Sequence, residues 1–335
     1  MKLNSIFCDG IVLQAGKPVR LFGEGDGDAY AVYAGVSYPA KHEDGAFVIE
    51  MPPQPYGTNK EIDIYLEGER VTLHGVSFGE VLLLSGQSNL QFSIADECGS
   101  HDFESDPELR FFGVNRPPEE TCHPFHEADG WVSLDNDTAP RVSAVGCHVG
   151  RALRERLCVP VGVVACFQGA STMQSWLSPE DAAAPDCFLP METRHGDSTH
   201  FPWNGDAFLY HFMFRKLIPY SFGHVIWYQG EGNTTLAEAA VYDHMLSHLV
   251  DGWRRDLRDG TLPFTVVVIH DYAARDDAGW HALQDAQRRY AARGVRGVSA
   301  VESADVCAHD NIHPADKRAL SVRITEDVLR RIRER

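Results

Sequence analysis

Basic residues and long apolar runs are both scarce in this sequence. The 335 residues include 30 Lys and Arg against 48 Asp and Glu, so the formal net charge is −18 at pH 7. This charge repels nucleic acid and anionic membrane surfaces, and we expect neither as a partner. No stretch approaches the roughly 20 apolar residues that a membrane span needs. The N-terminus also lacks the apolar segment of a secretory signal, so we expect a cytoplasmic protein.

Metal-binding patterns are absent as well. The eight cysteines contain no CxxC pair, and several lie in apolar runs, so we expect buried free thiols. The sixteen histidines contain no HExxH motif, and His244 with His248 lacks the glutamate of that pattern. We therefore expect no metal and no cofactor. With 44% hydrophobic and 23% charged residues, the chain should form one large folded domain and a smaller one.

The hydrophobic pattern changes near residue 76. Before that point, short β-rich runs alternate with turns of Gly, Asp and Pro, which predicts a small antiparallel β domain over residues 1–76. Residues 77–335 instead alternate apolar runs with amphipathic helical patterns. Continuous apolar strands occur where helices cover both faces of a parallel sheet, so this part should be a doubly wound α/β domain with three layers. The expected strands are 81–84, 109–114, 161–167, 225–228, 264–269 and 295–301.

Polar residues gather at the ends of these strands, where sheets of this class bind ligands. Ser88 follows the first strand, Gly169 the third and Gln229 the fourth, and Asp310 and His313 follow the last. A serine hydroxyl becomes a good nucleophile when a histidine takes its proton and a third group fixes the histidine tautomer. The strand ends therefore supply the parts of a serine hydrolase.

The turn at the serine is not the G-x-S-x-G elbow of the α/β-hydrolases, because Leu90 stands where the second glycine would be. Four ordered motifs instead resemble the sialate O-acetylesterase family of the SGNH hydrolases. They are Asp9-Gly-Ile-Val-Leu-Gln14, Gly86-Gln-Ser-Asn-Leu90, Trp227-Tyr-Gln-Gly-Glu-Gly-Asn233 and Asp310-Asn-Ile-His-Pro-Ala-Asp-Lys317. The resemblance covers the whole chain and implies the flavodoxin-like SGNH sheet. It also implies a carbohydrate O-acetylesterase, most simply one that acts on sialic acids.

The resemblance also implies roles for the residues at the strand ends. Ser88 would be the nucleophile, His313 the general base and Asp310 the group that orients the histidine. The backbone N–H groups of Ser88 and Gly169 and the side-chain amide of Gln229 would form the oxyanion hole. Such donors must converge on the oxygen that becomes negative as the ester turns tetrahedral.

Five further residues are candidates for substrate binding: Gln87, Asn89, Trp176, Tyr228 and Glu231. Aromatic faces suit sugar rings, but Trp176 and Tyr228 could equally pack in the core. Glu231 could be a second carboxylate near the site or a buried structural partner, for example of Arg254. Gly232 departs from the family motif, which has serine there, and this loss of a hydroxyl leaves the local hydrogen bonding open.

Other functions fit parts of the same pattern. An acetylxylan esterase or another SGNH acyl esterase would use the same serine and histidine on a different ester. A carbohydrate-binding protein without activity is an alternative of a different class. The nucleophile and the base are both present, and a binding protein would need neither. The sequence leaves open the sugar and the oligomeric state.

Overall fold

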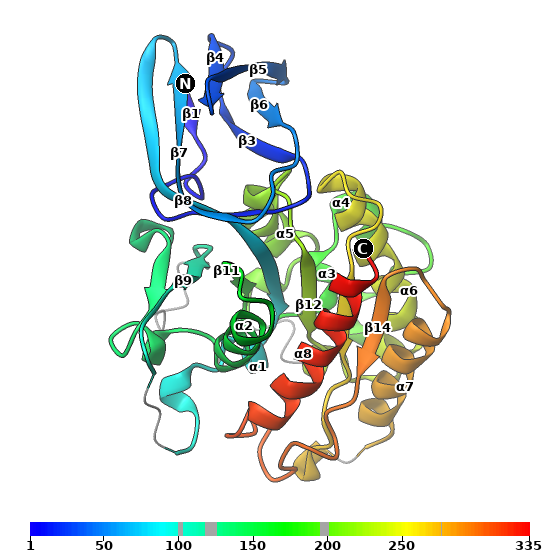
Figure 1. The fold of residues 1–335 in the computed structure, drawn as a ribbon. Coiled ribbons are helices and arrows are strands. Elements are labelled where there is room, and N and C mark those ends of the chain that lie inside the picture. The colour runs from blue at the N-terminus through cyan, green and yellow to red at the C-terminus, as the bar shows by residue number, and fades with distance from the viewer. Residues whose placement is uncertain (100–102, 118–125, 195–200, 276) are drawn as a thin grey trace.

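The computed structural model describes residues 1–335 except 100–102, 118–125, 195–200 and 276. The N-terminal strands form antiparallel layers at one end of the molecule (Figure 1). They pair in the order β1-β3-β6-β5-β4-β7-β8, and their inward-facing side chains, such as Leu21, Phe47 and Ile49, are fully buried. The strands are β1 Lys2–Leu3, β3 Val19–Glu24, β4 Ala29–Tyr33, β5 Val36–Glu43, β6 Ala46–Met51, β7 Gly57–Leu66 and β8 Glu69–Gly86.

Strand β8 belongs to both parts of the molecule. Its first residues pair with β7 in an antiparallel hairpin, and residues 80–86 pair in parallel with the strand that follows Pro160. The short strand β2, Val12–Gln14, also pairs with β8 in parallel and joins the two layers. The division between residues 76 and 77 stays a prediction, because one continuous strand crosses it.

The second part is an α/β sheet, as predicted. Its strand order is β10-β9-β11-β8-β12-β13-β14, and all neighbours are parallel except β10. The additional strands are β9 Asp106–Gly113, β10 Val132–Leu134, β11 Val161–Phe167, β12 His224–Tyr228, β13 Phe264–Val267 and β14 Val298–Val301. The six predicted apolar strands are confirmed. The strands β1, β2 and β5, the first part of β8 and the antiparallel edge strand β10 were not predicted.

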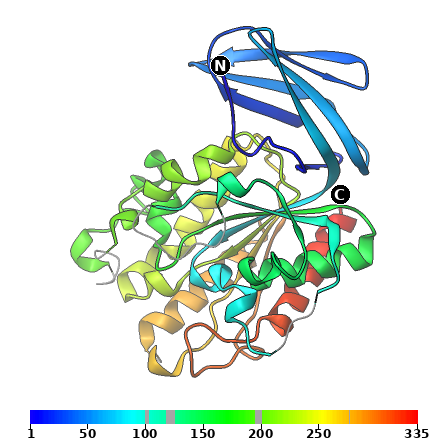
Figure 2. The same cartoon turned by 90° about the vertical axis from the view of Figure 1, so that its left-hand side faces the viewer.

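Helices cover both faces of this sheet (Figure 2). Helices α2 and α8 pack together on one face, and α6 and α7 pack together on the other. Two contacts identify the face that each pair of helices covers. Gly146 of α2 packs on Leu84 on one face, and Tyr242 of α6 contacts Trp227 on the other. The helices are α1 Ser88–Gln91, α2 Ala144–Leu157, α3 Met173–Trp176, α4 Pro179–Ala182, α5 Phe208–Phe212, α6 Leu236–Asp256, α7 Ala278–Ala292 and α8 Arg318–Arg333.

Two features of composition can be compared with the structure. Within the described residues, no helix has both the length and the apolar character needed to cross a bilayer. The seven cysteines that the structure describes are free, and Cys147, Cys166, Cys187 and Cys307 are buried as expected. Cys98 and Cys158 differ from the expectation because their side chains are exposed.

Candidate functional site

The turn that carries Ser88 depends on a glycine. Strand β8 ends at Gly86, whose φ is +137°, and a Cβ there would lie 2.1 Å from the carbonyl oxygen of Tyr228. Only glycine tolerates this backbone conformation and this close approach. The next residue, Gln87, donates its backbone N–H to the same carbonyl at 3.0 Å. The chain then enters α1 with Ser88 as its first residue, at the carboxyl end of the central strand.

The structure brings His313 to Ser88. His313 lies in the loop between β14 and α8, 225 residues further along the chain, and its Nε2 is 2.8 Å from Ser88 Oγ. Burial lowers the pKa of His313, the charge of Lys317 lowers it further, and the charge of Asp96 opposes both. The imidazole is therefore neutral near pH 7, and Nε2 is placed to accept the hydroxyl proton.

Asp310, which was predicted to orient His313, makes no hydrogen bond to the imidazole in the described structure. Asp310 is exposed, and the hydrogen bonds of His313 in the described part of the chain go to Ser88 and, from its backbone N–H, to Asn311 Oδ1. The geometry thus does not support Asp310 as the partner of the imidazole. The carboxylate that acts on the His313 pKa is Asp96, which lines the same cavity. Two residues in an irregular loop need not share a face, so the D-x-x-H spacing alone does not bring Asp310 to the imidazole.

The predicted oxyanion donors separate into two groups. Gly169 is next to the serine, since a Cβ on it would lie 3.7 Å from Ser88 Cβ, and its N–H donates to Gln91 Oε1 at 2.8 Å. Gln229 is fully buried, and its Nε2 donates to Ser171 O and Asn233 Oδ1, both at 2.9 Å. Both amide hydrogens of Gln229 are thus occupied inside the protein. The geometry keeps Gly169 as a candidate donor and does not support Gln229.

A cavity of about 330 Å³ opens beside the serine and the histidine. Its volume lies at the lower end of the range of small-molecule sites. Apolar side chains from β9, β11 and the segment before α2 form most of its wall, and Asp96, Arg116 and Arg141 add charge. Its lining residues are Ser88, Gln91, Phe92, Ser93, Asp96, Phe111, Phe112, Gly113, Val114, Arg116, Arg141, Val142, Ser143, Val163, Ala165, Phe167 and His313.

The five predicted substrate contacts do not line this cavity. All of them are buried: Gln87, Asn89, Trp176, Tyr228 and Glu231. Trp176 donates its indole N–H to Ser171 Oγ at 3.0 Å, so its aromatic faces belong to the core. The burial therefore argues against these five as substrate contacts.

The two open questions about the fourth strand's motif now have structural answers. Glu231 is a buried partner, but of Asn89 at 2.6 Å, whereas Arg254 bonds the carbonyl oxygens of Leu262 and Arg296. At Gly232, a Cβ would lie 2.6 Å from Ser171 O. A serine would not fit there without a shift of the backbone.

Apart from Ser88 and His313, sequence reasoning missed the residues that line the cavity. Gln91 lies three residues after Ser88 in the single turn of α1, so helical spacing could have indicated it. No sequence pattern indicated that Asp96 and Arg116 line the cavity, because their positions depend on the path of the chain after strands β8 and β9. The cavity is thus a product of chain topology.

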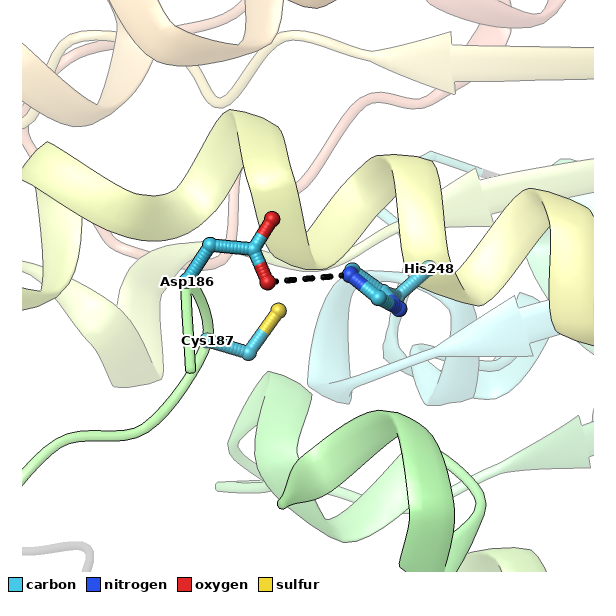
Figure 3. A group of neighbouring side chains, drawn as sticks. All are labelled: Asp186, Cys187 and His248. Atoms are coloured by element: carbon cyan, nitrogen blue, oxygen red, sulfur yellow. Dashed lines mark hydrogen bonds and ion pairs between the residues drawn. The ribbon is translucent and has the colours of Figure 1, made fainter. Parts of the chain in front are cut away.

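One group outside the site has side chains that can bind metals (Figure 3). Donor atoms of Asp186, Cys187 and His248 lie within 4.8 Å of one another. However, His248 Nδ1 is 3.1 Å from Asp181 Oδ1, and its Nε2 is 3.1 Å from Asp186 Oδ1. These contacts with two carboxylates raise the pKa of His248 against the effect of burial. Both ring nitrogens face carboxylate oxygens, and only a protonated imidazole can donate from both, so we interpret this group as an ion-pair cluster.

The sequence of this chain matches a known protein family and several of its members. The model of the family "Carbohydrate esterase, sialic acid-specific acetylesterase" matches residues 79–325. Sialate O-acetylesterase of Rattus norvegicus is 25% identical over 323 residues, with 77% of this chain and 58% of that protein covered. The Homo sapiens enzyme of that name is 25% identical over 320 residues, with 84% and 60% covered. The chain thus spans about three fifths of the length of these relatives.

The fold is shared with a solved structure. A carbohydrate acetylesterase from Xanthomonas citri superimposes with a TM-score of 0.82 at 22% sequence identity, over 100% of this chain and 76% of that one. This agreement confirms the predicted α/β fold. The family model covers both the Ser88 turn and the His313 loop, so the resemblance seen in the motifs is confirmed. The chain belongs to the sialic acid-specific acetylesterase family of carbohydrate esterases.

Proposed function

We propose that this protein is a carbohydrate O-acetylesterase that hydrolyses acetyl esters of sugars through an acetyl-enzyme on Ser88. The observation that carries the proposal is the 2.8 Å contact between Ser88 Oγ and His313 Nε2 at the edge of the cavity. Nucleophile and base must be within hydrogen-bond reach, and this pair is. Family membership supports the same reaction class.

In the first half of the reaction, Ser88 Oγ attacks the acetyl carbonyl carbon while its proton passes to His313 Nε2. The carbonyl oxygen becomes an oxyanion that the backbone N–H of Gly169 is placed to stabilise. That N–H donates to Gln91 Oε1 in the structure, so Gln91 has to turn away before the oxyanion can bind. The tetrahedral intermediate then collapses, and the protonated His313 gives its proton to the departing sugar oxygen.

In the second half, a water molecule gives its proton to His313 and attacks the acetyl-enzyme. Collapse of this second intermediate returns the proton from His313 to Ser88 Oγ and releases acetic acid, which loses its own proton to the solvent as acetate. These steps need no metal and no redox cofactor, because protons move only between the serine, the histidine, water and the sugar.

Among sugars we favour an O-acetylated sialic acid. Two arginines line the cavity: Arg116, which is largely buried, and Arg141, which also pairs with Asp129 at 3.1 Å. Guanidinium groups bind carboxylates well, and sialic acids carry one carboxylate that neutral acetylated xylose units lack. The apolar wall also favours one alternative, an esterase for longer acyl chains, since phenylalanine and valine side chains suit an alkyl group.

An acetate-release panel tests these proposals. The substrates are O-acetylated sialic acids, acetylated xylo-oligosaccharides and p-nitrophenyl acetate, butyrate and octanoate, each with the wild-type protein and with Ser88→Ala. We expect the sialic acid to give the highest kcat/KM and Ser88→Ala to give none above background. Faster cleavage of octanoate than acetate would replace the sugar proposal by a lipid-type esterase. Activity on xylan acetate alone would reverse the choice of sugar.

A further inference from the structure

A buried amide joins the two segments that carry Ser88 and His313. Asn89, the residue after the nucleophile, is fully buried, and its Nδ2 donates to Ile312 O at 3.1 Å and to Glu231 Oε1 at 2.6 Å. Its Oδ1 accepts a hydrogen bond from Lys317 Nζ at 2.6 Å. Ile312 immediately precedes His313, so one side chain connects the turn after β8 to the loop before α8.

Lys317 is held firmly in this position. Its side chain is fully buried, its backbone N–H donates to Glu97 Oε1 at 2.7 Å, and its Nζ lies 4.7 Å from the centre of the Phe92 ring. Burial lowers its pKa to about 8, and the charges of Glu231 and Glu97 act in the opposite direction. A buried ammonium is costly unless it is paired and hydrogen-bonded. Here the amide of Asn89 lies between the ammonium and the carboxylate of Glu231.

We propose that Lys317, Asn89 and Glu231 form a positioning unit that fixes the His313 loop against the Ser88 turn and so sets the contact between base and nucleophile. This inference rests on the proposed esterase function. A single hydroxyl–imidazole hydrogen bond is by itself too weak to hold in place a loop that is 225 residues away in the sequence. Three hydrogen bonds among buried side chains are a much stronger restraint.

The same unit places a positive charge near the base. The charged groups that act on His313 are Lys317 from the start of α8 and Asp96 from the 3-10 helix η1, Ile94–Asp96, and they act in opposite directions. Removal of the ammonium should raise the pKa of His313. A larger fraction of the imidazole would then be protonated, and inactive as a base, in mildly acidic solution. This shift separates a positioning role from a purely structural one.

The test uses Lys317→Met in the full chain, with Lys17→Met as the matched control. Lys17 is also largely buried, but its Nζ bonds Phe222 O and Asp259 before strands β12 and β13, at the opposite end of the sheet. We measure kcat/KM for p-nitrophenyl acetate from pH 5 to 9, together with the thermal unfolding midpoint. For Lys317→Met we expect a loss of about a hundredfold and an acid limb moved to higher pH. Lys17→Met should keep the wild-type rate and profile.

Asn89→Asp is the second variant, because it preserves side-chain volume and the acceptor for Lys317 but removes both donors. It should lose activity to a similar degree while it stays folded, and it decides the question if Lys317→Met does not fold. A folded Lys317→Met or Asn89→Asp protein with wild-type rate and profile would overturn the positioning unit. Hydrolysis by wild type and by Lys17→Met, abolished by Ser88→Ala, establishes the esterase independently of this outcome.

Discussion

The two sides of the Ser88 turn carry similar polar residues in different surroundings: one side borders a cavity, and the other is buried. On the side of β9, β11 and α2, the serine and histidine line a cavity that a ligand can enter. On the side of β12 and α6, the Gln229–Asn233 segment is buried, and its side chains bond one another. Asn233 Nδ2, for example, donates to Gln174 Oε1 and Glu238 Oε1. An amide that is satisfied inside the protein has no hydrogen left for a substrate.

The largest expected effect comes from the cavity side. Ser88→Ala and His313→Ala should each lower kcat by about a thousandfold or more, because nucleophile and base act as a unit. Thermal unfolding should change little, since both side chains border the cavity. A fluorophosphonate probe should label Ser88 and leave Ser171 unlabelled. Labelling of Ser171, or a near-normal rate in a His313 variant, would contradict the assignment of Ser88 as nucleophile and His313 as base.

On the buried side, Gln229→Leu should act mainly on stability. The change removes hydrogen bonds to Ser171 O and Asn233, and the buried partners left behind should cost about 1–3 kcal/mol in the free energy of unfolding. Gln14→Leu is a matched control, because Gln14 is equally buried and bonds Ala15 O and the Val81 N–H far from the serine. A loss of kcat confined to Gln229→Leu, with unchanged unfolding, would restore Gln229 as an oxyanion donor.

A filled cavity should affect large substrates more than small ones. Ala165 lies on the wall formed by β11, and Ala165→Leu should raise KM for an acetylated sugar about tenfold through steric exclusion. The change for p-nitrophenyl acetate should be much smaller. Ala165→Ser, which adds only one oxygen atom, serves as the control and should stay near wild type. Equal effects on both substrates would show that the sugar binds outside this cavity.

The smallest expected effects concern the two aspartates. Because burial and Lys317 lower the pKa of His313, wild-type kcat/KM should be on its plateau at pH 7 and fall only below the ordinary imidazole pKa of about 6.5. Asp96 raises this pKa, so Asp96→Asn should move the acid limb to lower pH and reduce kcat a few-fold. Asp310 is exposed, and Asp310→Asn should alter neither the acid limb of the pH profile nor kcat. If Asp310→Asn had the larger effect and Asp96→Asn the smaller one, Asp310 would again be the candidate that orients His313.

The regular part of the fold was open to prediction because hydrophobic periodicity is a local property. The continuous runs at 161–167 and 225–228 predicted buried parallel strands, and these became β11 and β12. Strand β10 was missed because its three residues carry too little pattern. The pairing of β8 with both layers could not be read from the sequence, since pairing depends on partners far along the chain.

For the site, the sequence by itself indicated Ser88 and His313 as the candidates for nucleophile and base, because motif and strand-end position point to them without knowledge of the fold. Only the tertiary structure decided which neighbours face them. It turned Asp310 to solvent, buried Gln229 in its own hydrogen bonds and set Asp96 beside the cavity. The reason is physical: strand ends are fixed by local pattern, whereas the direction of a side chain in a loop is set by contacts between distant segments.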